Sequence, residues 1–179
     1  MNRFTGAGWV IALCLIAGSA AATELRYNRL DLRHIVADTD SEQGIGIDLQ
    51  GLVTPGLYVV AGFNDSGVRQ VARYGGGYRY ALHPSSTDVF VEATGGGIKV
   101  KGLSTASGFG GSFGIRHLFT PALEGLVRVD YLSVDDPIGD DLSVTASGDW
   151  HFARRLSLVL KVSVEEETNS AGIGFRFSL

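Results

Sequence analysis

The chain has 179 residues, 25 glycines, 4 prolines and a formal net charge of −4. This length is typical of one domain, and the scattered glycines favour strands and turns over helices. The acidic balance argues against a nucleic-acid partner.

The first 22 residues have the three parts of an export signal. Arg3 supplies a positive start, residues 10–17 are apolar, and residues 20–22 are small alanines that suit signal-peptidase cleavage after Ala22. The apolar run is only about ten residues, shorter than the roughly twenty that a membrane-spanning helix needs. Because Cys14 lies inside this signal, we expect a mature domain at 23–179 without cysteine chemistry.

Segments with alternating apolar and polar residues follow one another along this domain, separated by turn signals. Ten such segments are found, at 25–36, 43–53, 57–64, 69–82, 88–100, 107–118, 122–134, 141–152, 156–165 and 171–179. Short connections alternate with longer acidic or Gly/Ser-rich ones, as in barrels of the outer membrane. We therefore predict an all-β fold, a transmembrane antiparallel up-and-down β-barrel of about ten strands with both termini on the periplasmic side. Eight strands is the alternative, if the hairpin 69–100 lies partly outside the wall.

The charged residues of these segments favour one face. In the segment 156–165, alternate positions from Leu158 to Val164 are apolar, and Val159 is the only apolar residue of the opposite face. A soluble periplasmic β-barrel would also alternate, with its charges in water. If the apolar face meets lipid, the charged residues line the lumen. The predicted lumen-lining residues are Arg29, Asp31, Arg33, Asp48, Arg73, Arg79, Glu92, Arg116, Glu124, Arg128, Asp130, Asp149, Lys161 and Arg176.

Two further patterns bear on the wall of the barrel. Glycine triplets at 75–77 and 95–97 would face each other across a hairpin, which indicates a sharp bend, a bulge or a close backbone approach. A change of alternation after the second triplet favours a bulge there. Aromatic residues near the periplasmic strand ends predict a girdle at the lipid headgroups: Tyr27, Tyr58, Tyr78, Tyr80, Phe119, Trp150, Phe152, Phe175 and Phe177.

The last ten residues, SAGIGFRFSL, form an apolar strand that ends the chain. Together with the export signal and the hairpins, they resemble the small bacterial outer-membrane β-barrel proteins of the OmpA-like or porin-family kind. In that family the last strand is read by the outer-membrane assembly machinery, which implies an assembly signal at Gly174, Phe177 and Leu179. Leu179 departs from the usual terminal aromatic residue. The resemblance implies an outer-membrane location, with membrane lipids, lipopolysaccharide and the assembly machinery as partners.

A barrel of this size is narrow, and its interior is filled by side chains or holds one small ligand. The interleaved charges of the predicted lumen favour a salt-bridged plug. We therefore expect a non-enzymatic barrel with a largely plugged lumen and a structural or surface-interaction role. Small glycine and serine side chains on 107–118 and 141–152 leave a narrow pore or conduit for a small solute as the alternative.

The sequence offers little catalytic chemistry. Asp149 and His151 resemble the Asp/His pair of omptin-like proteases, but they lie beside the short turn at 153–154, on the periplasmic side, whereas omptin chemistry sits at the outer rim. We expect no catalytic residue and no cofactor.

Acidic residues are concentrated in the predicted outer loops: Asp38, Asp40, Glu42, Asp65, Asp135, Asp136, Asp140, Asp141, Glu165, Glu166 and Glu167. Carboxylates are hard oxygen ligands, so divalent cations could link these loops to lipopolysaccharide phosphates. The alternative is that they are ordinary solvated loops. No individual metal ligand is assigned.

Overall fold

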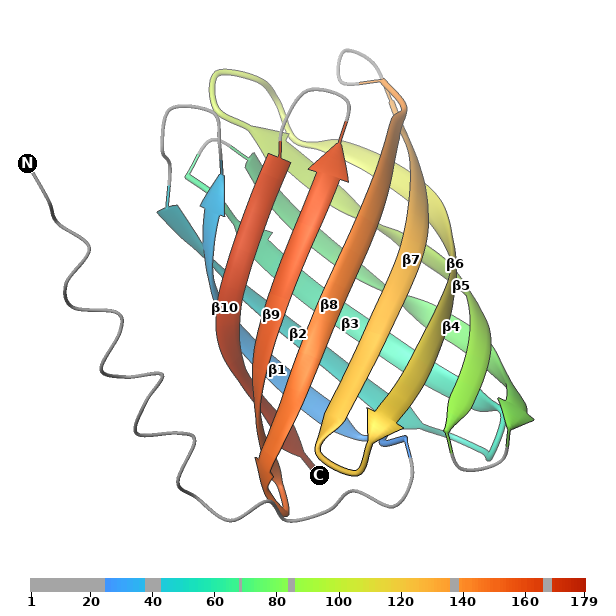
Figure 1. Ribbon diagram of the computed structural model, residues 1–179. Coiled ribbons are helices and arrows are strands. Elements are labelled where there is room, and N and C mark those ends of the chain that lie inside the picture. The colour runs from blue at the N-terminus through green and yellow to red at the C-terminus, as the bar shows by residue number, and fades with distance from the viewer. Residues whose placement is uncertain (1–24, 38–42, 68, 84–85, 136–138, 166–168) are drawn as a thin grey trace, which may run out of the picture.

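The computed structural model describes residues 25–37, 43–67, 69–83, 86–135, 139–165 and 169–179. The export signal predicted for residues 1–22 lies outside these ranges. Ten strands account for nearly all of the described chain (Figure 1): β1 Arg29–Ala37, β2 Gln43–Leu52, β3 Leu57–Asp65, β4 Arg69–His83, β5 Thr87–Val100, β6 Ala106–Thr120, β7 Leu123–Val134, β8 Asp141–Ala153, β9 Leu156–Glu165 and β10 Asn169–Ser178.

Each strand pairs antiparallel with its neighbours in the chain, and β1 also pairs with β10, which closes the barrel. The predicted ten-strand up-and-down barrel is therefore confirmed, and the eight-strand alternative is wrong. The hairpin of β4 and β5 is a full part of the wall, since β4 pairs with β3 and β5 with β6. No helix in the described ranges is long and apolar enough to cross a membrane.

The two ends of the barrel differ, and we name them by their residues. The terminal rim contains Leu25, Leu179 and the four short turns, and the loop rim is the opposite end, with Gly67, Gly102 and Gly139 (Figure 1). These three glycines have positive φ angles of 86°, 88° and 79°, which residues with a Cβ rarely adopt. The predicted alternation of connection lengths is reproduced in part: the strand bounds leave two to four residues at the terminal rim and three to six at the loop rim.

The outer surface of the barrel is apolar. Along β9, Leu160, Val162 and Val164 are each more than half exposed, whereas Ser157, Val159 and Ser163 on the opposite face are buried. The same alternation runs around the wall, with hydrophobic residues outside and most charged residues inside. A soluble barrel has the reverse distribution, because charges buried without solvent are costly. The soluble alternative is therefore wrong, and the exterior matches the apolar band of a transmembrane barrel.

The aromatic residues divide between the two faces. Tyr78, Tyr80 and Phe119 are exposed near the terminal rim, as the girdle prediction requires, and Phe175 and Phe177 also point outward. Trp150 and Phe152 are half-buried and lie in contact, with ring centroids 5.8 Å apart. The prediction is wrong for Tyr27 and Tyr58, which are 2% exposed and point into the barrel. A tyrosine at a strand end suits both the lipid headgroups and the barrel interior, so the residue type alone does not distinguish the two locations.

The glycine triplets allow the backbones of neighbouring strands to approach closely, and no bulge occurs at them. β4 and β5 keep a continuous register past both triplets, with Gly75 opposite Thr94 and Gly96 opposite Arg73. The predicted bulge is therefore wrong. The alternation does not change there, because Ile98 points into the barrel and is 2% exposed. Register shifts occur instead at the terminal-rim ends of β4, β6 and β8.

Two neighbouring glycines of the second triplet test this close approach. A Cβ on Gly96 would lie 2.0 Å from the backbone oxygen of Ala72, whereas a Cβ on Gly95 would meet nothing closer than 3.8 Å. We expect Gly96→Ala to lower the free energy of unfolding by about 1–3 kcal/mol because backbone must move, and Gly95→Ala to leave it nearly unchanged. Urea unfolding of the barrel in lipid vesicles measures both. Equal stability of the two variants would contradict the close-approach interpretation.

Candidate functional site

The interior of the barrel holds a small charged cavity of about 50 Å³. Six basic residues line it together with three acidic ones, and strands from both halves of the barrel contribute. The charged lining consists of Arg29, Arg33, Arg73, Arg128, Lys161, Arg176, Asp31, Asp48 and Glu92. All fourteen predicted lumen-lining residues lie at inward positions of their strands, and this cavity gathers nine of them.

One wall of the cavity is built on Asp48, which is shared by two arginines. Its carboxylate accepts hydrogen bonds from Arg33 and, at 3.1 Å, from Arg73. Two glycines leave space for this cluster. A Cβ on Gly62 would lie 2.4 Å from the Asp48 carboxylate, and one on Gly174 would lie 2.8 Å from the Cγ of Arg33. The wall therefore carries two guanidinium groups and one carboxylate.

A second wall contains Arg128 with a complete set of partners. Its guanidinium donates to Asp130 and, at 2.7 Å, to the hydroxyl of Ser112, and it lies 3.2 Å from the Glu92 carboxylate. The hydroxyl of Tyr58 also donates to Glu92, at 3.0 Å. These contacts hold the Arg128 side chain against the wall.

Below the cavity, toward the terminal rim, lies a buried ion-pair network centred on Arg176. Its guanidinium donates to Asp31 at 2.7 and 2.8 Å and to Asp149 at 2.5 Å, and it lies 3.4 Å from Glu124. Arg116 donates to the same Glu124 at 2.5 Å. All five residues are at most 3% exposed, so the network fills the lumen at this level.

The network also brings a serine, a histidine and a glutamate close together, with a hydrogen bond only between the serine and the histidine. The Ser157 hydroxyl lies 2.5 Å from Nδ1 of His151, and Nε2 of His151 lies 3.7 Å from Glu124. Ser157 is 1% exposed and His151 2% exposed, which leaves no room for a substrate at the hydroxyl. Asp149 pairs with Arg176 and makes no hydrogen bond with His151. Asp149 and His151 therefore do not form the contact that their resemblance to an omptin Asp/His pair would require.

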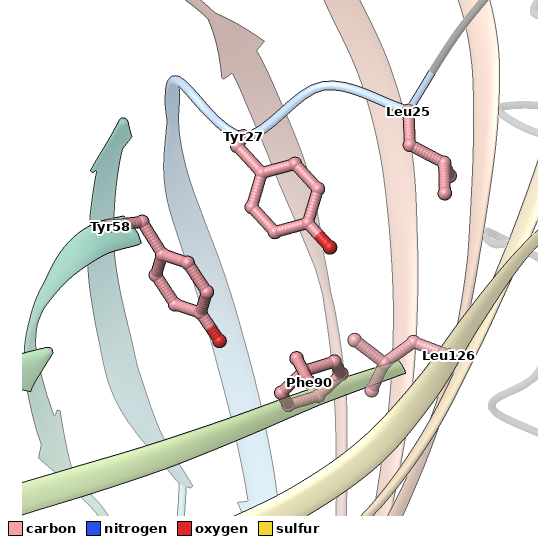
Figure 2. Packing of buried hydrophobic residues seen from close by; sticks show 5 residues of the cluster. All are labelled: Leu25, Tyr27, Tyr58, Phe90 and Leu126. Carbon is pink, nitrogen blue, oxygen red and sulfur yellow. The ribbon is translucent and has the colours of Figure 1, made fainter. Parts of the chain in front are cut away.

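An apolar cluster closes the terminal rim. The segment before β1 crosses the mouth of the barrel and inserts Leu25 and Tyr27 toward Tyr58, Phe90 and Leu126 (Figure 2). We call these five side chains the apolar plug. Sequence analysis placed residues 25–28 in the first strand, but β1 begins only at Arg29.

Tyr27 is held in the apolar plug by rings and charges. Its ring centroid lies 5.4 Å from that of Tyr58, and the guanidinium groups of Arg79 and Arg116 lie 4.5 and 4.8 Å from it. Burial raises the pKa of the Tyr27 hydroxyl to about 12. Asn28 fastens the segment to the wall, since its side chain accepts from the Leu52 amide at 2.7 Å and its backbone oxygen from Leu179 at 3.0 Å.

The loop rim has its own ion pairs. Arg69 donates to both Asp141 and Glu165 at 3.0 Å, which joins β4 to β8 and β9 across the opening. Asp140 accepts hydrogen bonds from Tyr131 at 2.6 Å and Ser133 at 2.8 Å, and these bonds lower the pKa of its carboxyl. Among the described residues no group of three histidine, cysteine or acidic side chains could hold a metal ion. Asp38, Asp40, Glu42, Asp136, Glu166 and Glu167 lie outside the described residues.

Several interior residues were missed by sequence reasoning. Asp88 is 2% exposed and pairs with Arg79 at 2.9 Å, yet it stands at a predicted strand start and was not assigned to a face. Its alternation with Phe90 and Glu92 could have placed it inside. The three predicted assembly-signal residues divide between the faces: Gly174 points inward, while Phe177 and Leu179 are exposed on the outer surface.

The closed wall, the apolar exterior and the charged interior define a transmembrane β-barrel. Solved outer-membrane porins share this fold. The NanC porin matches with a TM-score of 0.60 and 10% sequence identity, over 84% of this chain and 100% of that chain. The KdgM porin matches with a TM-score of 0.54 and 10% sequence identity, over 84% of this chain and 99% of that chain. A structure of the KdgM porin in complex with disordered oligogalacturonate matches with a TM-score of 0.52 and 11% sequence identity, over the same shares of the two chains.

At these identities the likeness concerns the fold. It confirms the predicted resemblance to outer-membrane β-barrels of the porin kind, and nothing ties the chain to the OmpA-like branch. No protein-family model and no curated protein matches the chain.

Proposed function

We propose that the chain is a non-enzymatic integral barrel of the outer membrane, closed to ions at its terminal rim, with a structural or surface-interaction role. One observation carries the proposal: the apolar plug and the Arg176 network fill the lumen between the cavity and the terminal rim. The burial of these side chains supports a lumen without a continuous water path, and narrow barrels are commonly filled by side chains.

The proposed location follows from the class of fold. A closed barrel with an apolar exterior satisfies its backbone hydrogen bonds in lipid, and the predicted export signal would deliver the chain across the inner membrane. Outer-membrane lipids and lipopolysaccharide would then surround the wall, and the assembly machinery would insert it. Divalent cations bound by the acidic loops remain part of this proposal.

A narrow pore is the second candidate. The fold is shared with the NanC and KdgM porins, and one KdgM structure contains oligogalacturonate, an acidic oligosaccharide. The basic excess of the cavity would suit a small anionic solute. Passage would require the apolar plug to leave the lumen, because Tyr27 and Tyr58 are each 2% exposed.

Planar-bilayer recording of the purified barrel separates the two candidates. We expect the wild-type protein to give no steady single-channel steps. Tyr27→Ala combined with Tyr58→Ala should also give no steps, because the Arg176 network still fills the lumen below the cavity, and Tyr78→Ala with Tyr80→Ala, on the outer surface, should behave as wild type. Steady steps from the wild-type protein would overturn the closed barrel and favour the pore.

A further inference from the structure

Positive charge exceeds negative charge around the central cavity. The lining has six basic and three acidic side chains. The acidic partners outside the lining are Asp130 for Arg128, and Asp149 and Glu124, toward the terminal rim, for Arg176. The acidic partners of the other interior arginines lie nearer the two rims, as in the pairs of Arg79 with Asp88 and of Arg69 with Asp141. The formal charges of the lumen are thus segregated along its length, with the excess of cations in the middle.

Two of the six cations have no direct ion pair among the described residues. The side chains of Arg29 and Lys161 make no hydrogen bond and no ion pair within 4 Å there, although carboxylates such as Asp31 and Asp48 lie farther away, and Nη1 of Arg29 is buried without a partner. Lys161 stands between Ser147 and Gly172, which offer it no carboxylate. Buried N–H donors without an acceptor cost free energy, and more when they are charged.

Two further residues of the cavity lining have an unused donor. Nε of Arg33 and Nε of Arg73 are buried without hydrogen-bond partners, although both guanidinium groups bind Asp48 through other nitrogens. Four basic side chains of the cavity lining therefore have unused donors or no partner at all. They come from β1, β4 and β9, which lie on different sides of the lumen.

We propose that this cavity is a binding site for a small oxyanion of the phosphate or sulfate type. Such an ion carries the missing negative charge and presents several oxygen acceptors to guanidinium and ammonium donors. The cavity volume of about 50 Å³ exceeds the roughly 10–15 Å³ that one water molecule requires, yet it is too small for an oligosaccharide. The site is independent of whether the barrel conducts, because it lies between the two rims and needs access from one side only.

Thermal unfolding of the full barrel in detergent, with inorganic phosphate exchanged for chloride at constant ionic strength, tests this site. The unfolding temperature of the wild type should rise with phosphate, since a ligand that binds only the folded state stabilises it. Lys161→Met should show two opposite changes. It should unfold at a higher temperature than wild type in chloride, because a buried charge without a direct ion pair has been removed, and should lose at least tenfold in phosphate affinity.

Two variants make the result specific. Lys99→Met removes an exposed lysine of β5 from the outer surface and should keep the full response to phosphate. Arg29→Met provides a second lumen variant, should Lys161→Met fail to fold, and should also weaken phosphate binding. The inference is overturned if phosphate does not stabilise the wild type beyond chloride, or if Lys161→Met and Lys99→Met respond to phosphate equally. Bilayer conductance plays no part in either outcome, so failure here and failure of the proposed function are distinguishable.

Discussion

Arg176→Met is expected to prevent stable folding of the barrel. The guanidinium group of Arg176 is the shared partner of Asp31 and Asp149 and also approaches Glu124. Without it, Asp31 and Asp149 become buried carboxylates that have lost their direct ion-pair partner, and Asp149 is 0% exposed. Removing one partner of a buried ion pair costs about 3–5 kcal/mol, and here two carboxylates lose theirs. The loss is of the same size as the whole stability of many domains.

The folded fraction can be read from heat-modifiable migration on gels after refolding into vesicles. Arg154→Met is the matched control, because Arg154 is exposed at the terminal rim and its removal should leave folding unchanged. Combining Arg176→Met with Asp31→Asn and Asp149→Asn should recover much of the folded fraction, since the amides need no counter-ion. If Arg176→Met alone folds as well as wild type, the network is not a determinant of folding.

The fold was predictable because a barrel wall repeats one simple pattern. Alternation along segments such as 156–165 fixes which side chains face lipid, and the short turns fix the hairpins. The strand bounds differ from prediction by a few residues at most, with the largest difference at the N-terminal end of β1. There the parity of the apolar residues changes, from odd positions at Leu25 and Tyr27 to even positions from Leu30 onward. This change is the signal in the sequence that the chain leaves the wall before β1.

The arrangement inside the lumen could not be predicted in the same way. Strand parity indicates that Arg33, Asp48 and Lys161 point inward, but pairing depends on strand stagger and on which glycines leave space. Asp48 pairs with Arg33 and Arg73 and not with Lys161, because Gly62 and Gly174 open space beside the arginines. The interleaved charges of the sequence suggested uniform ion pairing, whereas the structure has a cationic centre between more acidic ends.

The glycine at position 174 can be explained either by recognition during assembly or by close packing of β10 against β1. The terminal-strand resemblance implies a role in assembly, whereas in the structure a Cβ at this position would lie 2.0 Å from the backbone oxygen of Leu32. Close packing of β10 against β1 therefore requires glycine here whether or not the residue is recognised during assembly. The terminal residues need an experiment that separates closure of the barrel from recognition.

Deleting Phe177, Ser178 and Leu179 is expected to abolish assembly of the barrel in cells. β10 closes the wall, with Phe177 opposite both Leu30 of β1 and Leu156 of β9. The amides of Ser178 and Leu179 donate to the backbone oxygens of Arg155 and Asn28, at 2.9 and 3.0 Å. Without these residues, backbone groups at the terminal rim lose their partners, which is costly where lipid replaces water.

Comparing assembly in cells with refolding of purified protein into vesicles identifies the cause. If the truncated chain refolds but does not assemble in cells, the terminal residues act as a recognition signal. If both fail, closure of β10 between β1 and β9 is the main requirement. Leu179→Phe is the matched substitution, because Leu179 is 69% exposed on the outer surface and packs against nothing that a larger ring would displace. It should leave refolding unchanged and assembly unchanged or improved. Normal insertion of the truncated chain would contradict both roles, since the wall would then close without its last three residues.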